Sequence, residues 1–301
     1  MWDVGEKARR MPVSTGVLIS SALTEIVRMQ PRSVLDAGCG FGLCGFLCRL
    51  YLDVFVGRRY KNDWRVRIEG IEVFPKYIMA HQEFIYDDIH IGKIEEVIDR
   101  LGVFDLYIFG DVLEHLEKEV GVRVLESACR KTNKGVLINI PLGEGWYREA
   151  PGENVYEAHL SAWELEDFAP YYAKVCAEAT FPDVGHYATI LISRSLSEAA
   201  KAEVMYRNGV LCCERHREFA MGCLRRAIEI GYSDPSAHFE LSRLLLEHQE
   251  IGEAVRILRG AIARFPDHAP TYDLLSTLLR KVDRADEAEE VLAAKPPPLS
   301  V

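Results

Sequence analysis

Three alternate glycines follow an aspartate in segment 36–42, which reads Asp-Ala-Gly-Cys-Gly-Phe-Gly. An apolar run at 33–35 precedes the segment, and an apolar stretch from Leu43 to Leu52 follows it, so we expect strand, turn and helix. Because glycine has no Cβ, the backbone of such a turn admits close contact with a ligand. A dinucleotide fingerprint needs a third glycine three residues after the second, and Leu43 occupies that position.

Two further acids stand where strands are expected to end. Glu72 lies at the tip of the strand-like segment 68–73, and Asp111 comes soon after the strand-like segment 104–109. Ligands of open α/β sheets bind beyond the carboxyl ends of the strands. A carboxylate at that edge can accept charge-assisted hydrogen bonds. Both acids are therefore candidate ligand contacts.

A long polar and aromatic segment follows Pro141 and contains His159. Histidine titrates near neutral pH and can accept a proton from a hydroxyl or an amine. We predict His159 as the catalytic base, with a hydrogen-bonding role in holding the loop as the alternative. The predicted substrate contacts are Tyr147, Tyr156, Glu157 and Trp163, and a packing role suits Trp163 equally.

Strand-like and helix-like segments alternate up to about residue 195, which predicts a parallel sheet covered on both faces. Helices are expected at 16–29, after the capping residues Ser14 and Thr15, and at 112–130. The predicted strands are 33–37, 67–73, 87–91, 104–109, 136–140, 173–179 and 187–193, the last two forming an antiparallel pair. The predicted fold class is α/β for residues 1–195.

An internal repeat replaces the strand pattern from about residue 197 to 297. Positions 34 residues apart carry the same residue type: Ala220, Ala254 and Ala288; Leu224, Leu258 and Leu292; Leu211, Leu245 and Leu279. Such units bury their apolar faces only against neighbours, so about three stacked helix pairs are expected. The pattern resembles tetratricopeptide (TPR) repeats, with Arg207 in the first repeat where the others have leucine. An ordinary helical bundle is the alternative.

Length and charge narrow the function classes. The 301 residues suit about two domains. A net charge of −10 without a large basic cluster argues against nucleic acid as a partner. The N-terminal segment contains the acidic residues Asp3 and Glu6, so we expect no signal peptide. Arg49 and Asp53 interrupt the apolar run after the glycine turn, so we expect no membrane span there.

Cysteine usage points to a reducing compartment. The eight cysteines include no Cys-x-x-Cys pair, so we expect no metal site. Free thiols on apolar faces are typical of a reduced protein, and we predict a cytoplasmic location.

The motif at 36–42 is similar to motif I of the class I S-adenosylmethionine (SAM) methyltransferases. The segment Val112-Leu113-Glu114-His115-Leu116 resembles a signature of many small-molecule members. The resemblance covers about two thirds of the chain and implies a seven-stranded Rossmann-like sheet with SAM as cofactor and S-adenosylhomocysteine (SAH) as product. It implies that Glu72 binds the ribose and that Asp36 faces the methionine ammonium, or else caps the turn. The implied cofactor contacts are Asp36, Gly38, Cys39, Gly40, Gly42, Glu72, Val73, Ile94, Asp111 and Val112.

Lys93 departs from that pattern. Many relatives have an acid after the third strand that accepts from the adenine amino group, and lysine has only donors. Backbone groups and apolar packing are then expected to hold the adenine. His115 could be a base, although a structural role at the start of the helix is preferred.

The expected function is SAM-dependent methyl transfer to an oxygen or nitrogen of a small molecule or sugar-like metabolite. A peptide or protein acceptor held by the repeats is the alternative, because such repeats bind polypeptides in a groove. Two rivals remain: a nicotinamide oxidoreductase on a similar sheet, and a binding module that has lost catalysis.

Overall fold

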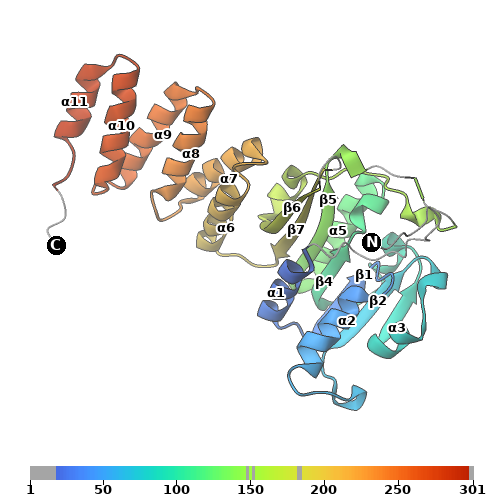
Figure 1. Ribbon diagram of the computed structural model, residues 1–301. Helices are drawn as coiled ribbons and strands as arrows, with labels where there is room; N and C mark the ends of the chain where they lie inside the picture. The colour runs from blue at the N-terminus through green and yellow to red at the C-terminus, as the bar shows by residue number, and fades with distance from the viewer. Residues whose placement is uncertain (1–17, 147–148, 151–152, 182–184, 298–301) are drawn as a thin grey trace, which may run out of the picture. The chain divides into compact units, whose positions relative to one another are not determined.

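The structure is a computed structural model that describes residues 18–146, 149–150, 153–181 and 185–297. These residues divide into two compact units between Ser195 and Leu196. The strands of the described chain all lie in the first unit, and the second consists of helices (Figure 1).

The first unit is built on one seven-stranded sheet with the order β3-β2-β1-β4-β5-β7-β6. Strands β1 to β5 pair in parallel, and β7 runs antiparallel to both β5 and β6. The strands are β1 (Ser33–Ala37), β2 (Arg67–Glu72), β3 (Asp88–Ile91), β4 (Phe104–Gly110), β5 (Thr132–Leu142), β6 (Lys174–Phe181) and β7 (Gly185–Ser193). The predicted fold class, a Rossmann-like sheet closed by an antiparallel pair, is confirmed.

Helices cover both faces of this sheet, with α1 and α2 on one face and α5 on the other (Figure 1). The α-helices are α1 (Ile19–Met29), α2 (Leu43–Arg49), α3 (Ala80–Ile85), α4 (Ile94–Val97) and α5 (Lys118–Lys131). A π-helical turn, η2 (Leu50–Val54), continues α2. The 3₁₀ turns are η3 (Lys61–Asp63), η4 (Pro75–Tyr77), η5 (Leu113–His115), η6 (Glu144–Trp146), η7 (Val155–Glu157) and η8 (Leu165–Tyr171). Helix α1 therefore begins at Ile19, and residues 16 and 17 of the predicted helix lie outside the described residues.

The core beneath α1, α2 and α3 joins the helices to the central strands. Ile26 of α1, Cys48 of α2 and Ile85 of α3 are buried in one cluster with Val34 of β1 and Leu106 of β4. Burial of each large apolar side chain contributes about 1.5–3 kcal/mol, so this cluster holds the helices firmly on the sheet. Because β1 pairs in parallel with both β2 and β4, the carboxyl ends of these strands lie along one edge.

The prediction of one helix over 112–130 is wrong, because the chain leaves the helical conformation after η5. Leu116 (φ −101°, ψ 150°) and Glu117 (φ −55°, ψ 142°) are extended, and α5 begins at Lys118. The break leaves the Glu114 carbonyl outside any helix ladder. It accepts hydrogen bonds from the N–H groups of Leu160 (2.7 Å) and Ser161 (3.1 Å).

The described residues of the second unit form six helices that stack as three pairs. They are α6 (Glu198–Leu211), α7 (Arg217–Ile230), α8 (Ser236–Glu247), α9 (Ile251–Arg264), α10 (Ala269–Lys281) and α11 (Ala285–Ala293). The repeated alanines Ala220, Ala254 and Ala288 are fully buried, as small residues must be where helices touch. Arg207 is exposed and pairs with Glu203, whereas Leu241 and Leu275 at equivalent positions are buried. The unit is a helical repeat. Across the described residues, the helices lack the combination of length and apolar character that crossing a bilayer requires.

Candidate functional site

A cavity of about 450 Å³ lies where β1, β2 and β4 end at the carboxyl edge of the sheet. Twelve of the predicted site residues line it: Asp36, Gly38, Cys39, Gly40, Glu72, Val73, Ile94, Asp111, Val112, Tyr156, Glu157 and His159. A topological edge of this kind is where open α/β sheets bind ligands. The structure thus brings together residues that lie up to 123 positions apart in the sequence.

The glycine turn forms one wall of the cavity. Gly38 (φ 85°) and Gly40 (φ 48°) adopt left-handed conformations that favour glycine. The N–H groups of Gly38 and Cys39 donate to the Ile71 carbonyl, each at 2.9 Å, which ties the turn to β2. The turn is therefore held rigidly beside the end of that strand.

The Glu72 carboxylate is fixed by backbone donors. Oε2 accepts from the Gly40 N–H at 2.9 Å, and Oε1 accepts from the Phe74 N–H at 2.8 Å. Burial raises the pKa of Glu72 and the Glu157 carboxylate adds to the increase, while these two N–H groups act in the opposite direction. A carboxylate offers about four lone-pair positions, so both oxygens retain capacity for a ligand hydroxyl.

Asp36 lines the same cavity and also supports the start of α2. Its Oδ2 accepts from the Tyr86 hydroxyl at 2.5 Å and from the Gly45 N–H at 3.1 Å. Burial raises the pKa of Asp36 to about 6, although both hydrogen bonds oppose the increase. Asp36 therefore stabilises the turn, and its side chain also lines the cavity.

Three predicted residues are not placed on this cavity. Gly42 caps α2 with φ 90°, and a Cβ there would lie 2.9 Å from Gln82 Cγ, so packing against α3 explains the glycine. Trp163 is 1% exposed and stacks on Phe168. Tyr147 lies outside the described residues. Lys93, the basic residue expected to lie near the adenine, does line the cavity.

A second cavity of about 320 Å³ adjoins the first, and Glu114, Pro141, Trp146, His159 and Leu160 line both. His159 is positioned by the hydrogen bonds that flank it. His115 Nδ1 lies 3.0 Å from the Ala158 carbonyl, and the N–H groups of Leu160 and Ser161 donate to Glu114. Trp163 Nε1 in turn donates to Ser161 Oγ at 3.0 Å, so this buried tryptophan anchors the loop.

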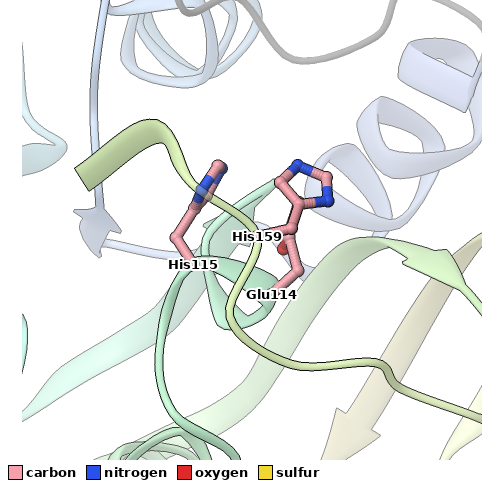
Figure 2. A group of neighbouring side chains, drawn as sticks. All are labelled: Glu114, His115 and His159. Atoms are coloured by element: carbon pink, nitrogen blue, oxygen red, sulfur yellow. The ribbon is translucent and has the colours of Figure 1, made fainter. Parts of the chain in front are cut away.

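Glu114, His115 and His159 are neighbours (Figure 2). All three line the larger cavity, and Glu114 and His159 also line the second. One carboxylate oxygen and one ring nitrogen from each histidine lie within 4.8 Å of one another. The two imidazole rings meet edge to face, with centroids 4.8 Å apart. These three groups combine ligand types that divalent transition metals accept.

Sequence reasoning assigned no role to Glu114 and missed Tyr86 as the partner of Asp36. The adjacent Glu114-His115 pair, followed by a third polar residue at His159, was visible in the sequence. The metal-site expectation, however, rested on cysteine spacing alone. No sequence signal linked Tyr86 to Asp36, since 50 residues separate them.

Acidic side chains dominate the larger cavity. Its described lining contains seven carboxylates, at Asp36, Glu72, Glu95, Asp111, Glu114, Glu117 and Glu157, against a single lysine, Lys93. The amide hydrogens that such turns offer to phosphates are also engaged here. Gly40 N–H donates to Glu72, and Gly45 N–H donates to Asp36. The cavity therefore favours a cationic ligand over a pyrophosphate.

No family model matches the sequence, and no curated protein matches it. Among solved structures, the chain is similar in fold to magnesium protoporphyrin IX methyltransferase (ChlM) from Synechocystis PCC 6803 with bound SAH. The identity is 15% and the TM-score 0.40, over 58% of this chain and 81% of that one. TehB from Haemophilus influenzae has 15% identity and a TM-score of 0.42, over 60% and 64%.

MamA has 20% identity and a TM-score of 0.30, over 33% of this chain and 58% of that one. The chain thus spans less than two thirds of MamA and of TehB. At these identities the likeness concerns the fold alone.

Proposed function

We propose that the first unit is a SAM-dependent methyltransferase acting on an oxygen or nitrogen of a small molecule or sugar-like metabolite. The observation that carries the proposal is the pair of buried carboxylates, Asp36 and Glu72, facing one acidic cavity on either side of a glycine turn. SAM carries a net positive charge and two ribose hydroxyls, which this arrangement complements. The bound sulfonium would supply an activated methyl group.

Each wall of the cavity has a distinct task in this proposal. Glu72 would accept from the ribose hydroxyls while Gly40 and Phe74 hold its oxygens in place. Ionised Asp36 would attract the ammonium group. Val73, Ile94 and Val112 would pack against the adenine, beside Gly38 and Cys39. Asp111, whose Oδ1 accepts from the Tyr187 hydroxyl at 2.7 Å, would close the methyl end.

The acceptor would enter from the second cavity, toward the residues shared by both. His159 would accept the acceptor's proton as general base, and Tyr156 and Glu157 would contact the acceptor. Trp163 is not among the described residues that line either cavity, so we propose that this residue anchors the loop instead. Free thiols at all eight cysteines support a reducing, cytoplasmic setting for the protein.

Calorimetry on the full chain tests the cofactor. SAM and SAH are expected to bind with one site per chain, and NAD is expected not to bind. Binding of NAD but not SAM would favour the oxidoreductase rival. SAM binding without methyl release on fractionated cell extract would favour a binding module instead, for which Lys93 in the cavity is the supporting feature.

A peptide or protein acceptor is the second candidate, and the helical repeat favours it. The 34-residue spacing of buried alanines supports a TPR-like unit, and such units hold extended polypeptides. Transfer of labelled methyl from SAM into the protein fraction of an extract, rather than into small molecules, would select this candidate.

A further inference from the structure

We propose that Glu114, His115 and His159 bind a divalent transition-metal ion of the zinc type, and that the ion binds an oxygen of the methyl acceptor. Two imidazoles and one carboxylate form a donor set that leaves further positions on the ion open. The role of the ion rests on the methyltransferase proposal above, whereas its binding does not.

The distances are close to those of a coordination sphere. The three donor atoms lie within 4.8 Å of one another. Donors about 2.1 Å from an ion are roughly 3 to 4 Å apart, so shifts of about 1 Å would close the site. Glu114 and His159 are buried, 2% and 7% exposed, which protects such a site from competing water.

The surroundings also orient one ligand as metal sites require. A carbonyl oxygen can only accept, so His115 must carry its proton on Nδ1, 3.0 Å from the Ala158 carbonyl. In this tautomer the lone pair that can bind a metal is on Nε2. Metal-binding histidines commonly donate their other N–H to a carbonyl in this manner.

The position of the three residues indicates what the ion would do. Glu114 and His159 line both cavities, so an ion between them would meet a ligand from either side. An acceptor hydroxyl bound to the ion loses its proton to solvent more readily. The oxygen then forms a bond to the methyl carbon as the carbon–sulfur bond breaks, which gives a methyl ether, SAH and one released proton. A histidine nitrogen that binds the ion cannot also accept that proton, so this inference replaces the base role of His159.

Calorimetry on the EDTA-treated full chain tests ion binding directly. One Zn²⁺ per chain is expected to bind with micromolar affinity or better, while Mg²⁺ binds far more weakly because imidazole suits transition metals. His115→Gln and His159→Gln should each weaken Zn²⁺ binding by more than ~100-fold. His90→Gln is the matched control, since His90 Nε2 lies 2.7 Å from Glu69 Oε2 outside both cavities.

Two outcomes would overturn the ion site. One is absence of Zn²⁺ binding to a chain that circular dichroism shows to be folded. The other is full Zn²⁺ binding by the His115→Gln/His159→Gln double variant, which would assign the ion to cysteine thiols. SAM calorimetry on the same samples separates the two proposals. SAM binding without Zn²⁺ binding would refute only the proposed metal site. Zn²⁺ binding without SAM binding would refute only the proposed methyltransferase function.

The oxygen-binding role has its own readout. Co²⁺ in the site should give a visible absorption spectrum that is absent from the double variant. Acetohydroxamate, an oxygen-donor probe, should change that spectrum by entering the open positions. An unchanged spectrum at saturating acetohydroxamate would refute the acceptor role of the ion.

Discussion

Replacing Glu72 with glutamine tests the cofactor site most directly. Both carboxylate oxygens accept a backbone N–H, from Gly40 at 2.9 Å and from Phe74 at 2.8 Å. An amide has one oxygen and one NH₂ group, so Glu72→Gln must turn a donor toward one of these N–H groups. A buried donor left without an acceptor costs about 1–3 kcal/mol of stability.

The same change removes the negative charge that faces the proposed ribose. A hydrogen bond to a charged group contributes about 1.5–3 kcal/mol, so the dissociation constant for SAM should rise roughly 10- to 150-fold. Isothermal titration calorimetry measures the affinity, and urea unfolding measures the stability.

Glu69→Gln provides the matched control for this experiment. Glu69 lies on the same strand, pairs with His90 and Arg67, and does not line the cavity. Its substitution should leave SAM affinity unchanged. Wild-type SAM affinity in a folded Glu72→Gln chain would refute the assignment of this carboxylate to the ribose.

Three other residues and the domain division give further predictions. Asp36 has a pKa raised to about 6, so SAM should bind about tenfold more weakly for each pH unit below 6, and Asp36→Asn should abolish this dependence in calorimetry. The stability of the SAM-free chain has the opposite pH dependence and should fall as the pH rises toward 6. The reason is that Asp36 ionises more readily in the unfolded chain, where its pKa is not raised. Gly40→Val should block SAM binding, because the valine side chain would enter the cavity. Gly57→Val is the control: it also places valine at a positive φ (96°), but in open space, so this variant should bind SAM normally. Asp53→Ala should reduce the free energy of unfolding by about 3–5 kcal/mol without changing SAM affinity, since buried Arg49 loses the carboxylate at 2.7 Å and keeps the part-exposed Asp87 at 3.1 Å; a loss below 1 kcal/mol in urea unfolding would contradict this. Deleting residues 196–301 should preserve SAM affinity, as the described cavity lining lies between Asp36 and Tyr187; loss of binding by a folded truncation would contradict it.

Local sequence patterns were sufficient for the sheet and for the cofactor edge. Strand-like segments of five to seven residues between turns predicted each strand of the described chain, because strand character depends on neighbouring residues. Parallel strands place their carboxyl ends at one edge, so Glu72 and Asp111 could be assigned to a common cavity before any coordinates. The helical repeat could also be predicted from the regular spacing of alanines, since each helix pair buries the same positions.

The sequence by itself determined which elements form and which acids stand at their ends. Only the tertiary structure decided how side chains distant in sequence meet. The extended residues Leu116 and Glu117 break the expected helix. The Glu114 carbonyl can therefore accept hydrogen bonds from the N–H groups of Leu160 and Ser161. These bonds bring His159 close to Glu114 and His115. The same folding buries Trp163 beneath the loop instead of in the cavity. Hydrophobic periodicity records which face of an element is buried, but not the path of an irregular loop, because that path depends on hydrogen bonds to partners more than 40 residues away.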